Sequence, residues 1–127
     1  MKYLLDTHAV IWYMGNSPKL PSKMKEIIGS EDNGIYLCSV SLWEIAIKVS
    51  LGKLESSLTF DGLLDKIESS RIRLLQIEYE HLKKLAALPV LHKDPFDRQL
   101  VAAALVENLT IITVDTHIQN YDVPWIW

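Results

Sequence analysis

Short apolar runs, separated by segments with the period of a helix, constrain the fold of this sequence more than any other feature. The first run, at residues 3–5, is too short for a helix and too apolar for a loop, so we expect a buried strand there. Residues 35–39 and 109–113 are expected to form further strands, and residues 72–77 are a strand candidate. Residues 123–127 are expected to add a short edge strand. Helical segments separate the four main strands, and this order favours parallel pairing through crossover connections. We therefore predict a three-layer α/β/α sandwich with a central parallel sheet.

Six helices are expected around this sheet. The spacing of apolar residues and the breaks at Gly and Pro place them at residues 7–14, 22–28, from 41 to near 52, 60–68, 79–88 and from 94 through 105. The sequence has 127 residues, enough to bury a core and too few for two domains, and it contains no linker or internal repeat. We expect residues 1–127 to form one domain.

Four acidic residues occupy equivalent places in this predicted order. Asp6 ends the first strand and Asp115 follows the last long one, while Glu44 and Asp97 lie near the starts of the third and sixth helices. In a parallel sheet the strand ends and the starts of the following helices meet at one edge, where ligands bind. We therefore expect the four carboxylates to lie on one rim.

Carboxylates crowded on one rim repel one another unless a cation neutralises them or some are protonated. A hard divalent ion with oxygen ligands is the natural occupant of such a rim. The chain carries 16 acidic and 13 basic residues, a net charge of −3, which argues against a large basic surface for nucleic acid. Any contact with nucleic acid must therefore be small or bridged by a metal ion.

The same acids also have simpler interpretations as helix caps. Asp6 could cap the helix that follows it, and Ser41 with Glu44 matches a capping box. Asp94 suits the N-cap position of the sixth helix, with Asp97 near the positive end of the helix dipole. These alternatives stay open, and it is the coincidence of four acids that favours a shared site.

Several residues near these acids have both a functional and a structural interpretation. His92, Lys93 and Arg98 could contact a phosphate, or they could belong to an ordinary solvated loop. Lys48 is expected to pair with Glu44, which lies one helical turn earlier.

The remaining histidine, cysteine and aromatic residues indicate no further chemistry. His81 is expected on the surface of a helix, and Cys38 is expected to be a small buried hydrophobic residue. The histidines lack a zinc-site spacing, and no motif for nucleotide binding, zinc proteolysis or serine hydrolysis is present. The tryptophans are expected to be core or interface anchors: Trp12, Trp43, Trp125 and Trp127.

Four sequence motifs, taken in order, resemble those of the PIN-domain ribonucleases. They are LLDTH at residues 4–8, SLWEI at 41–45, HKDPFDR at 92–98 and IITVD at 111–115. The likeness extends from Lys2 to Asp115 and is greatest to the VapC-type toxins of toxin–antitoxin pairs. It includes the HxDPFDR run of one subgroup.

The resemblance implies a Mg²⁺- or Mn²⁺-dependent endoribonuclease that acts on RNA, is usually dimeric, and is held inactive by a small antitoxin. It places the catalytic and metal-binding positions at Asp6, Glu44, Asp97 and Asp115. Asp6 and Asp97 would hold the ion most directly, and an activated water would attack the phosphodiester in line. Glu44 and Asp115 would complete the site through water or a second ion. Asp94 leaves open which of Asp94 and Asp97 faces the metal.

Two other functions are open on the sequence alone. Asp6 could be the nucleophile of a phosphoacceptor or phosphohydrolase, although His8 stands where such sites want a second acid. The chain could also be a catalytically silent scaffold that only binds a partner. The first apolar run stops at Asp6, far short of a signal peptide or a membrane span, so we expect a cytoplasmic protein without membrane contact.

Overall fold

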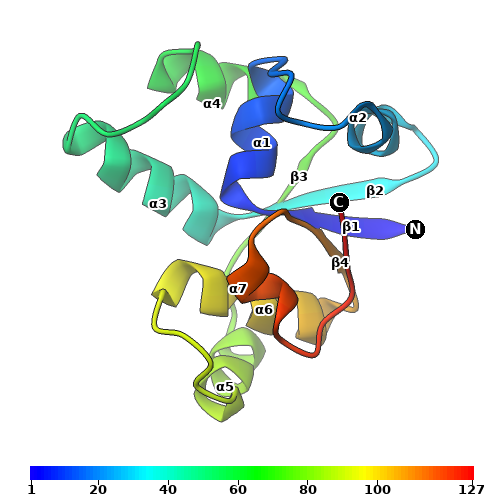
Figure 1. Ribbon diagram of the computed structural model, residues 1–127, viewed down its shortest axis with the longest axis vertical. Coiled ribbons are helices and arrows are strands. Elements are labelled where there is room, and N and C mark those ends of the chain that lie inside the picture. Colours follow the sequence, from blue (N-terminus) through cyan, green and yellow to red (C-terminus); the bar gives the residue numbers. More distant parts are fainter.

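The five strands of the chain form one parallel sheet, as the alternation of strands and helices along the sequence predicts. The structure is a computed structural model and describes residues 1–127. The strands are β1 Lys2–Leu5, β2 Gly34–Cys38, β3 Arg73–Leu75, β4 Thr110–Ile112 and β5 Trp125–Ile126. They pair in the order β3-β2-β1-β4-β5, and every neighbouring pair is parallel (Figure 1). Because β1 is central, the residue that follows it lies in the middle of the carboxyl edge of the sheet.

Seven helices connect and cover the strands. They are α1 Thr7–Met14, α2 Ser22–Gly29, α3 Ser39–Ser50, α4 Phe60–Ser69, α5 Tyr79–Ala87, α6 Pro95–Glu107 and α7 Thr116–Gln119. Six of them correspond to the predicted helices, and α7 is a short additional one that the apolar spacing did not reveal. None of the seven combines the length and the apolar composition that a bilayer-spanning helix needs.

Alternate residues of β1 face opposite layers of the molecule. Tyr3 and Leu5 belong to a core with side chains from α1, α2 and α4, whereas Leu4 belongs to a core with side chains from α6 and α7. Figure 1 shows α1, α2 and α4 on one side of the sheet and α5, α6 and α7 on the other. Ala103 and Ala104 of α6 are fully buried, and such small side chains let a helix approach a sheet closely. The predicted three-layer sandwich is confirmed.

The start of α3 differs from the prediction. α3 begins at Ser39, directly after β2, and Cys38 occupies the N-cap position without a side-chain hydrogen bond. Ser41 therefore lies inside the helix, where it is fully buried and its hydroxyl has no hydrogen-bond partner. The predicted capping box of Ser41 and Glu44 is wrong, because the chain passes from strand to helix without the intervening residues that a start at Ser41 requires.

The environment of His81 on α5 also differs from the prediction, since this side chain is buried rather than on the helix surface. Its Nδ1 accepts a hydrogen bond from the backbone N–H of Glu78, and its Nε2 lies 3.3 Å from a carboxylate oxygen of Glu107. Glu107 lies on α6, so the packing of α5 against α6 turns this face of α5 inward. A contact between two helices cannot be predicted from the local sequence, so the burial of His81 was missed. Strand β3, at Arg73–Leu75, is shorter than the predicted strand at 72–77.

Candidate functional site

Asp6 follows the central strand β1 and is only 3% exposed. Its Oδ1 accepts a hydrogen bond of 2.7 Å from the backbone N–H of Ala9 and so caps α1. Burial raises the pKa of Asp6, the side chain of Thr113 and the amide of Ala9 lower it, and the charge of Asp115 raises it further. The cap and the rim interpretations of Asp6 are therefore compatible, because one residue does both.

Asp115 follows β4, the neighbour of β1, and repeats this arrangement. Its Oδ1 accepts a hydrogen bond of 2.8 Å from the backbone N–H of His117 and caps α7. Its own backbone N–H donates to the hydroxyl of Thr113 at 3.0 Å. The short helix that the sequence pattern did not reveal is therefore the element that orients this acid.

Asp94 and Asp97 have separate roles at the start of α6. Oδ1 of Asp94 accepts hydrogen bonds from the backbone N–H groups of Phe96, at 2.9 Å, and of Asp97, at 3.1 Å, which confirms Asp94 as the N-cap. Asp97, two residues after Pro95, places one carboxylate oxygen 3.2 Å from Nε2 of His92. Burial first, and then the charge of Asp94, raise the pKa of Asp97 to about 6.

Glu44 approaches the same edge of the sheet from α3. Its Oε1 accepts a hydrogen bond of 2.7 Å from the hydroxyl of Thr7, and its Oε2 lies 3.1 Å from Nζ of Lys48. The predicted pair of Lys48 and Glu44 is confirmed. Because Thr7 directly follows Asp6, the hydrogen bond from Thr7 ties Glu44 to the end of β1.

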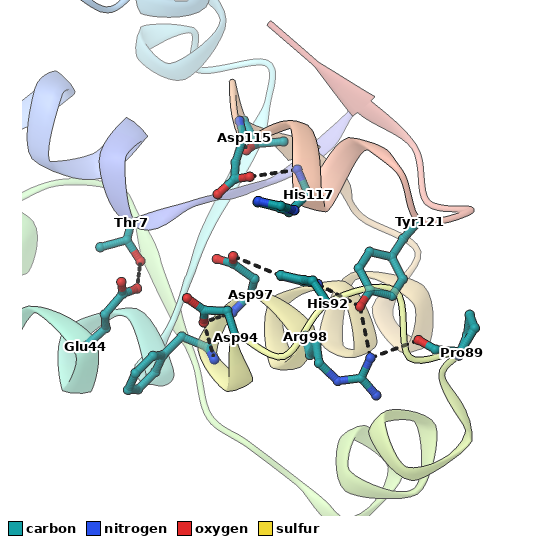
Figure 2. Close-up of polar contacts among 12 residues, drawn as sticks. Thr7, Glu44, Pro89, His92, Asp94, Asp97, Arg98, Asp115, His117 and Tyr121 are labelled. Carbon is teal, nitrogen blue, oxygen red and sulfur yellow. Dashed lines mark hydrogen bonds and ion pairs between the residues drawn. The ribbon is translucent and has the colours of Figure 1, made fainter.

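The four predicted acids thus converge on one edge of the sheet. After burial, the charges of Asp94, Asp115 and Glu44 all raise the pKa of Asp97, while the hydrogen bond from His92 lowers it. Figure 2 shows the carboxyl groups of Asp94, Asp97 and Asp115 facing the same space. No three His, Cys, Asp or Glu side chains are already arranged to hold a metal ion together.

A divalent cation suits these residues chemically. Carboxylate oxygens are the ligands that Mg²⁺ and Mn²⁺ prefer. Burial first, and then the charges of neighbouring acids, raise the pKa of Asp6 and Asp97, so the protein compensates their negative charge only in part. An ion would relieve this repulsion, and the side chains must draw closer together than they are here to surround it.

A chain of hydrogen bonds leads from Arg98 to Asp97 through Tyr121 and His92 (Figure 2). The guanidinium of Arg98 only donates, so the Tyr121 oxygen accepts at 2.9 Å and its O–H is free to donate to Nδ1 of His92, also at 2.9 Å. When Nδ1 of His92 accepts from Tyr121 in this way, the neutral ring carries its proton on Nε2 and donates it to Asp97. The ring of His117 stacks parallel to that of His92 at 5.1 Å.

These contacts revise the predicted roles of the residues around Asp97. His92 does not belong to a solvated loop, since its side chain is 11% exposed and both ring nitrogens are hydrogen-bonded. Arg98 donates to the carbonyl of Pro89 and to Tyr121. Lys93 is exposed at the surface. Tyr121 was missed in the sequence, because nothing near it in the chain indicates a partner 29 residues away.

The raised pKa of Asp97 predicts a pH-dependent effect on stability. The carboxyl group titrates near 3.8 when unfolded and near 6 when folded, so the folded state binds more protons between these values and loses stability as the pH rises through this range. Asp97→Asn lacks this loss. In EDTA we expect it to unfold with a free energy about 1–3 kcal/mol higher than the unmodified chain at pH 8, and with little difference at pH 4.

Urea unfolding at the two pH values measures this difference. Glu68→Gln, which removes an exposed acid of α4, is the control for the loss of one carboxylate. Millimolar Mg²⁺ should then stabilise the unmodified chain more than Asp97→Asn, by mass action. An Asp97→Asn variant that is the less stable protein at pH 8 in EDTA contradicts the proposed repulsion.

The hydrogen-bond chain predicts a second titration effect. Tyr121→Phe keeps the ring but removes the group that holds the His92 proton on Nε2, so the bond that lowers the pKa of Asp97 is weakened. The pKa of Asp97 should therefore rise above its value of about 6. The chemical shift of the Asp97 carboxyl carbon, followed by NMR over pH, measures this change. An unaltered titration of Asp97 would show that Tyr121 does not affect its pKa.

Comparisons with known proteins agree with this architecture. The PIN domain profile matches residues 3–124. The fold is similar to VapBC2 from Rickettsia felis bound to a promoter DNA fragment, with a TM-score of 0.74, 18% identity, and 99% of this chain and 98% of that chain covered. For DNA-bound VapBC from Salmonella typhimurium the TM-score is 0.72 and the identity 18%, over 99% and 97% of the two chains.

A third similar structure is FitAcB from Neisseria gonorrhoeae, with a TM-score of 0.69, 22% identity, and 100% of this chain and 97% of that chain covered. No functionally curated protein matches the sequence. The matched residues 3–124 include the five acids described above, of which Glu44 lies in the second turn of α3 rather than at its start. On the strength of that match, this chain belongs to the PIN domain family.

Proposed function

We propose that the chain is a Mg²⁺- or Mn²⁺-dependent endoribonuclease and the toxin of a toxin–antitoxin pair, with residues 1–127 as its nuclease domain. The observation that carries the proposal is the meeting of four carboxylates at the carboxyl edge of a PIN-domain sheet, where burial and repulsion raise the pKa of two of them. A chain of net charge −3 can bring RNA to such an edge if a divalent cation offsets the repulsion.

The four acids have distinct proposed roles. Asp6 and Asp97 hold the ion most directly, and Glu44 and Asp115 complete the site. A divalent ion in such a site supplies activation of water and neutralisation of the charge on the phosphodiester. Oδ1 of Asp94 accepts two backbone hydrogen bonds, whereas Asp6 and Asp115 each accept one, so we keep Asp94 outside the proposed ligand set as the cap of α6.

Hydrogen bonds within the protein orient the proposed ligands before any substrate arrives. Thr7 donates to Glu44, and His92 donates to Asp97. Groups held in this way need less rearrangement during reaction, which is the usual origin of electrostatic catalysis. His92 and Arg98 therefore act on Asp97, and the exposed Lys93 is the remaining proposed contact for a substrate phosphate.

A small antitoxin is the proposed partner. The structures from Rickettsia felis and Salmonella typhimurium are VapBC complexes, and a further similar structure is a toxin–antitoxin complex from Klebsiella pneumoniae, with a TM-score of 0.63 and 16% identity. These similarities support the proposal through a shared fold. The homodimer that the family resemblance implies remains a prediction.

The nuclease proposal is tested by incubating the purified chain, freed of any bound partner, with mixed RNA in Mg²⁺, Mn²⁺ or EDTA. We expect internal cleavage with either metal and none in EDTA. RNA that binds but stays intact with both metals favours the silent scaffold instead. A phosphoacceptor would be labelled on Asp6 by acetyl phosphate, whereas the proposed nuclease would not.

A further inference from the structure

A cationic groove lies beside the carboxylates, between α1, the C-terminal half of α3 and the loop after α3. We call it the lysine groove, and its cavity of about 280 Å³ is lined by Lys19, Lys48 and Lys53 together with His8 and Trp12. The only acid in its lining is Glu55. In a chain of net charge −3, this is a local reversal of charge.

Aromatic rings form one wall of the lysine groove. The exposed ring of His8 stacks on Trp12 with 5.3 Å between ring centres and 29° between planes. Nζ of Lys19 lies 5.8 Å from the Trp12 ring centre. Trp12 is held in place by an edge-on contact with Trp127 at 5.8 Å. A supported aromatic face surrounded by ammonium groups is the combination that binds single-stranded nucleic acid, the base by stacking and the backbone by charge.

The lysine groove is joined to the carboxylate edge by specific contacts. Lys48 lines the groove and pairs with Glu44 at 3.1 Å, and Glu44 accepts a hydrogen bond from Thr7. Thr7 stands between Asp6 and His8 in the chain. The start of α1 therefore places the carboxylate of Asp6 at the site and the exposed imidazole of His8 in the groove. A strand that crosses the carboxylate edge therefore continues into the groove within a short distance.

The charges near the site favour this route for RNA. Phosphates on either side of the one being cut meet an acidic surface, and each needs a cation from the protein. On the α6 side of the site, Nη1 of Arg98 donates to Pro89 and Tyr121, and Lys93 is the one phosphate contact proposed there. A second cavity of about 350 Å³ shares Trp12, Lys19 and Glu55 with the lysine groove, which lengthens the path along α1.

We propose that the lysine groove binds the segment of single-stranded RNA next to the scissile phosphate. Lys19 and Lys53 contact its backbone phosphates, Lys48 does so with the N–H groups not directed at Glu44, and a base stacks on the exposed face of His8. This inference rests on the proposed function and assigns a substrate subsite to it. An acidic peptide is the rival occupant. It would pair with the lysines, but it has no base to stack on the exposed ring of His8.

Binding of fluorescein-labelled oligouridine, followed by fluorescence anisotropy in Mg²⁺, tests the proposal in the Asp6→Asn background, which keeps the RNA uncut. Lys19→Glu with Lys53→Glu is compared with Lys83→Glu plus Lys84→Glu, on α5. All four lysines are exposed, and the two pairs change the net charge equally. We expect the groove pair to weaken binding at least about tenfold and to reduce the salt slope by about 1.4, and the α5 pair to change neither appreciably.

A third variant separates stacking from charge. His8→Ala should weaken oligouridine binding about five- to tenfold while leaving the salt slope unaltered. The proposal is overturned if the groove pair binds like the α5 pair, if no variant binds oligouridine, or if a short oligoaspartate peptide binds the groove more tightly than the RNA. Metal-dependent cleavage by the unmodified chain is scored separately, so loss of the groove and loss of the proposed function are distinguishable.

Discussion

Asp6→Asn is expected to abolish metal-dependent RNA cleavage while leaving the fold intact. Asp6 follows the central strand, and its 3% exposure places the carboxylate at the buried centre of the acidic edge. Asparagine keeps an oxygen that can accept the hydrogen bond from Ala9, so the cap of α1 persists while the charge is lost. We expect a loss of about three orders of magnitude or more in cleavage rate, the upper scale for one strong electrostatic contribution.

The rate of cleavage of a labelled RNA in Mg²⁺ measures this effect, and thermal unfolding in EDTA checks the fold. The variant should melt no lower than the unmodified chain, because burial raises the pKa of Asp6 and its charge is therefore a cost to folding. Asp65→Asn, which removes an exposed acid of α4, serves as the control for net charge. Full activity in Asp6→Asn would remove this edge of the sheet from consideration as the active site.

The second large effect separates Asp97 from Asp94. Asp97→Asn should slow cleavage by at least about two orders of magnitude, since it removes one of the two charges proposed to hold the ion. Asp94→Ser should be nearly silent. A serine oxygen can accept the backbone hydrogen bonds that Asp94 now accepts from Phe96 and Asp97, so the cap of α6 is kept.

Asp94→Ser should still leave one signature. The charge of Asp94 is the largest contribution after burial to the raised pKa of Asp97, so removing it should shift the acid limb of the pH–rate profile to lower pH. Cleavage rates from pH 5 to 8 for both variants measure this. If Asp94→Ser abolishes cleavage and Asp97→Asn does not, the two roles are assigned the wrong way round.

Most of the fold and of the helix caps could be predicted from local features of the sequence. The strands at β1 and β2 and the helices α1, α2 and α4 lie within two residues of their predicted bounds, because their apolar spacing is read from neighbours in the chain. Asp94 as the cap of α6 was predictable for the same reason, since its bonds reach only Phe96 and Asp97. The convergence of the acids followed from the alternation of strands and helices and the single hand of crossover connections.

The sequence by itself therefore determined the three layers, the parallel direction of the strands and the edge at which the acids gather, and the strand order came from the structure. Only the tertiary structure decided that His81 is buried against α6, that α3 starts at Ser39, and that His92 reaches Asp97 with Tyr121 behind it. The lysine groove is likewise a feature that only the tertiary structure decided. The physical reason is that these features depend on pairs of side chains far apart in the chain, whose contact is set by packing rather than by propensity.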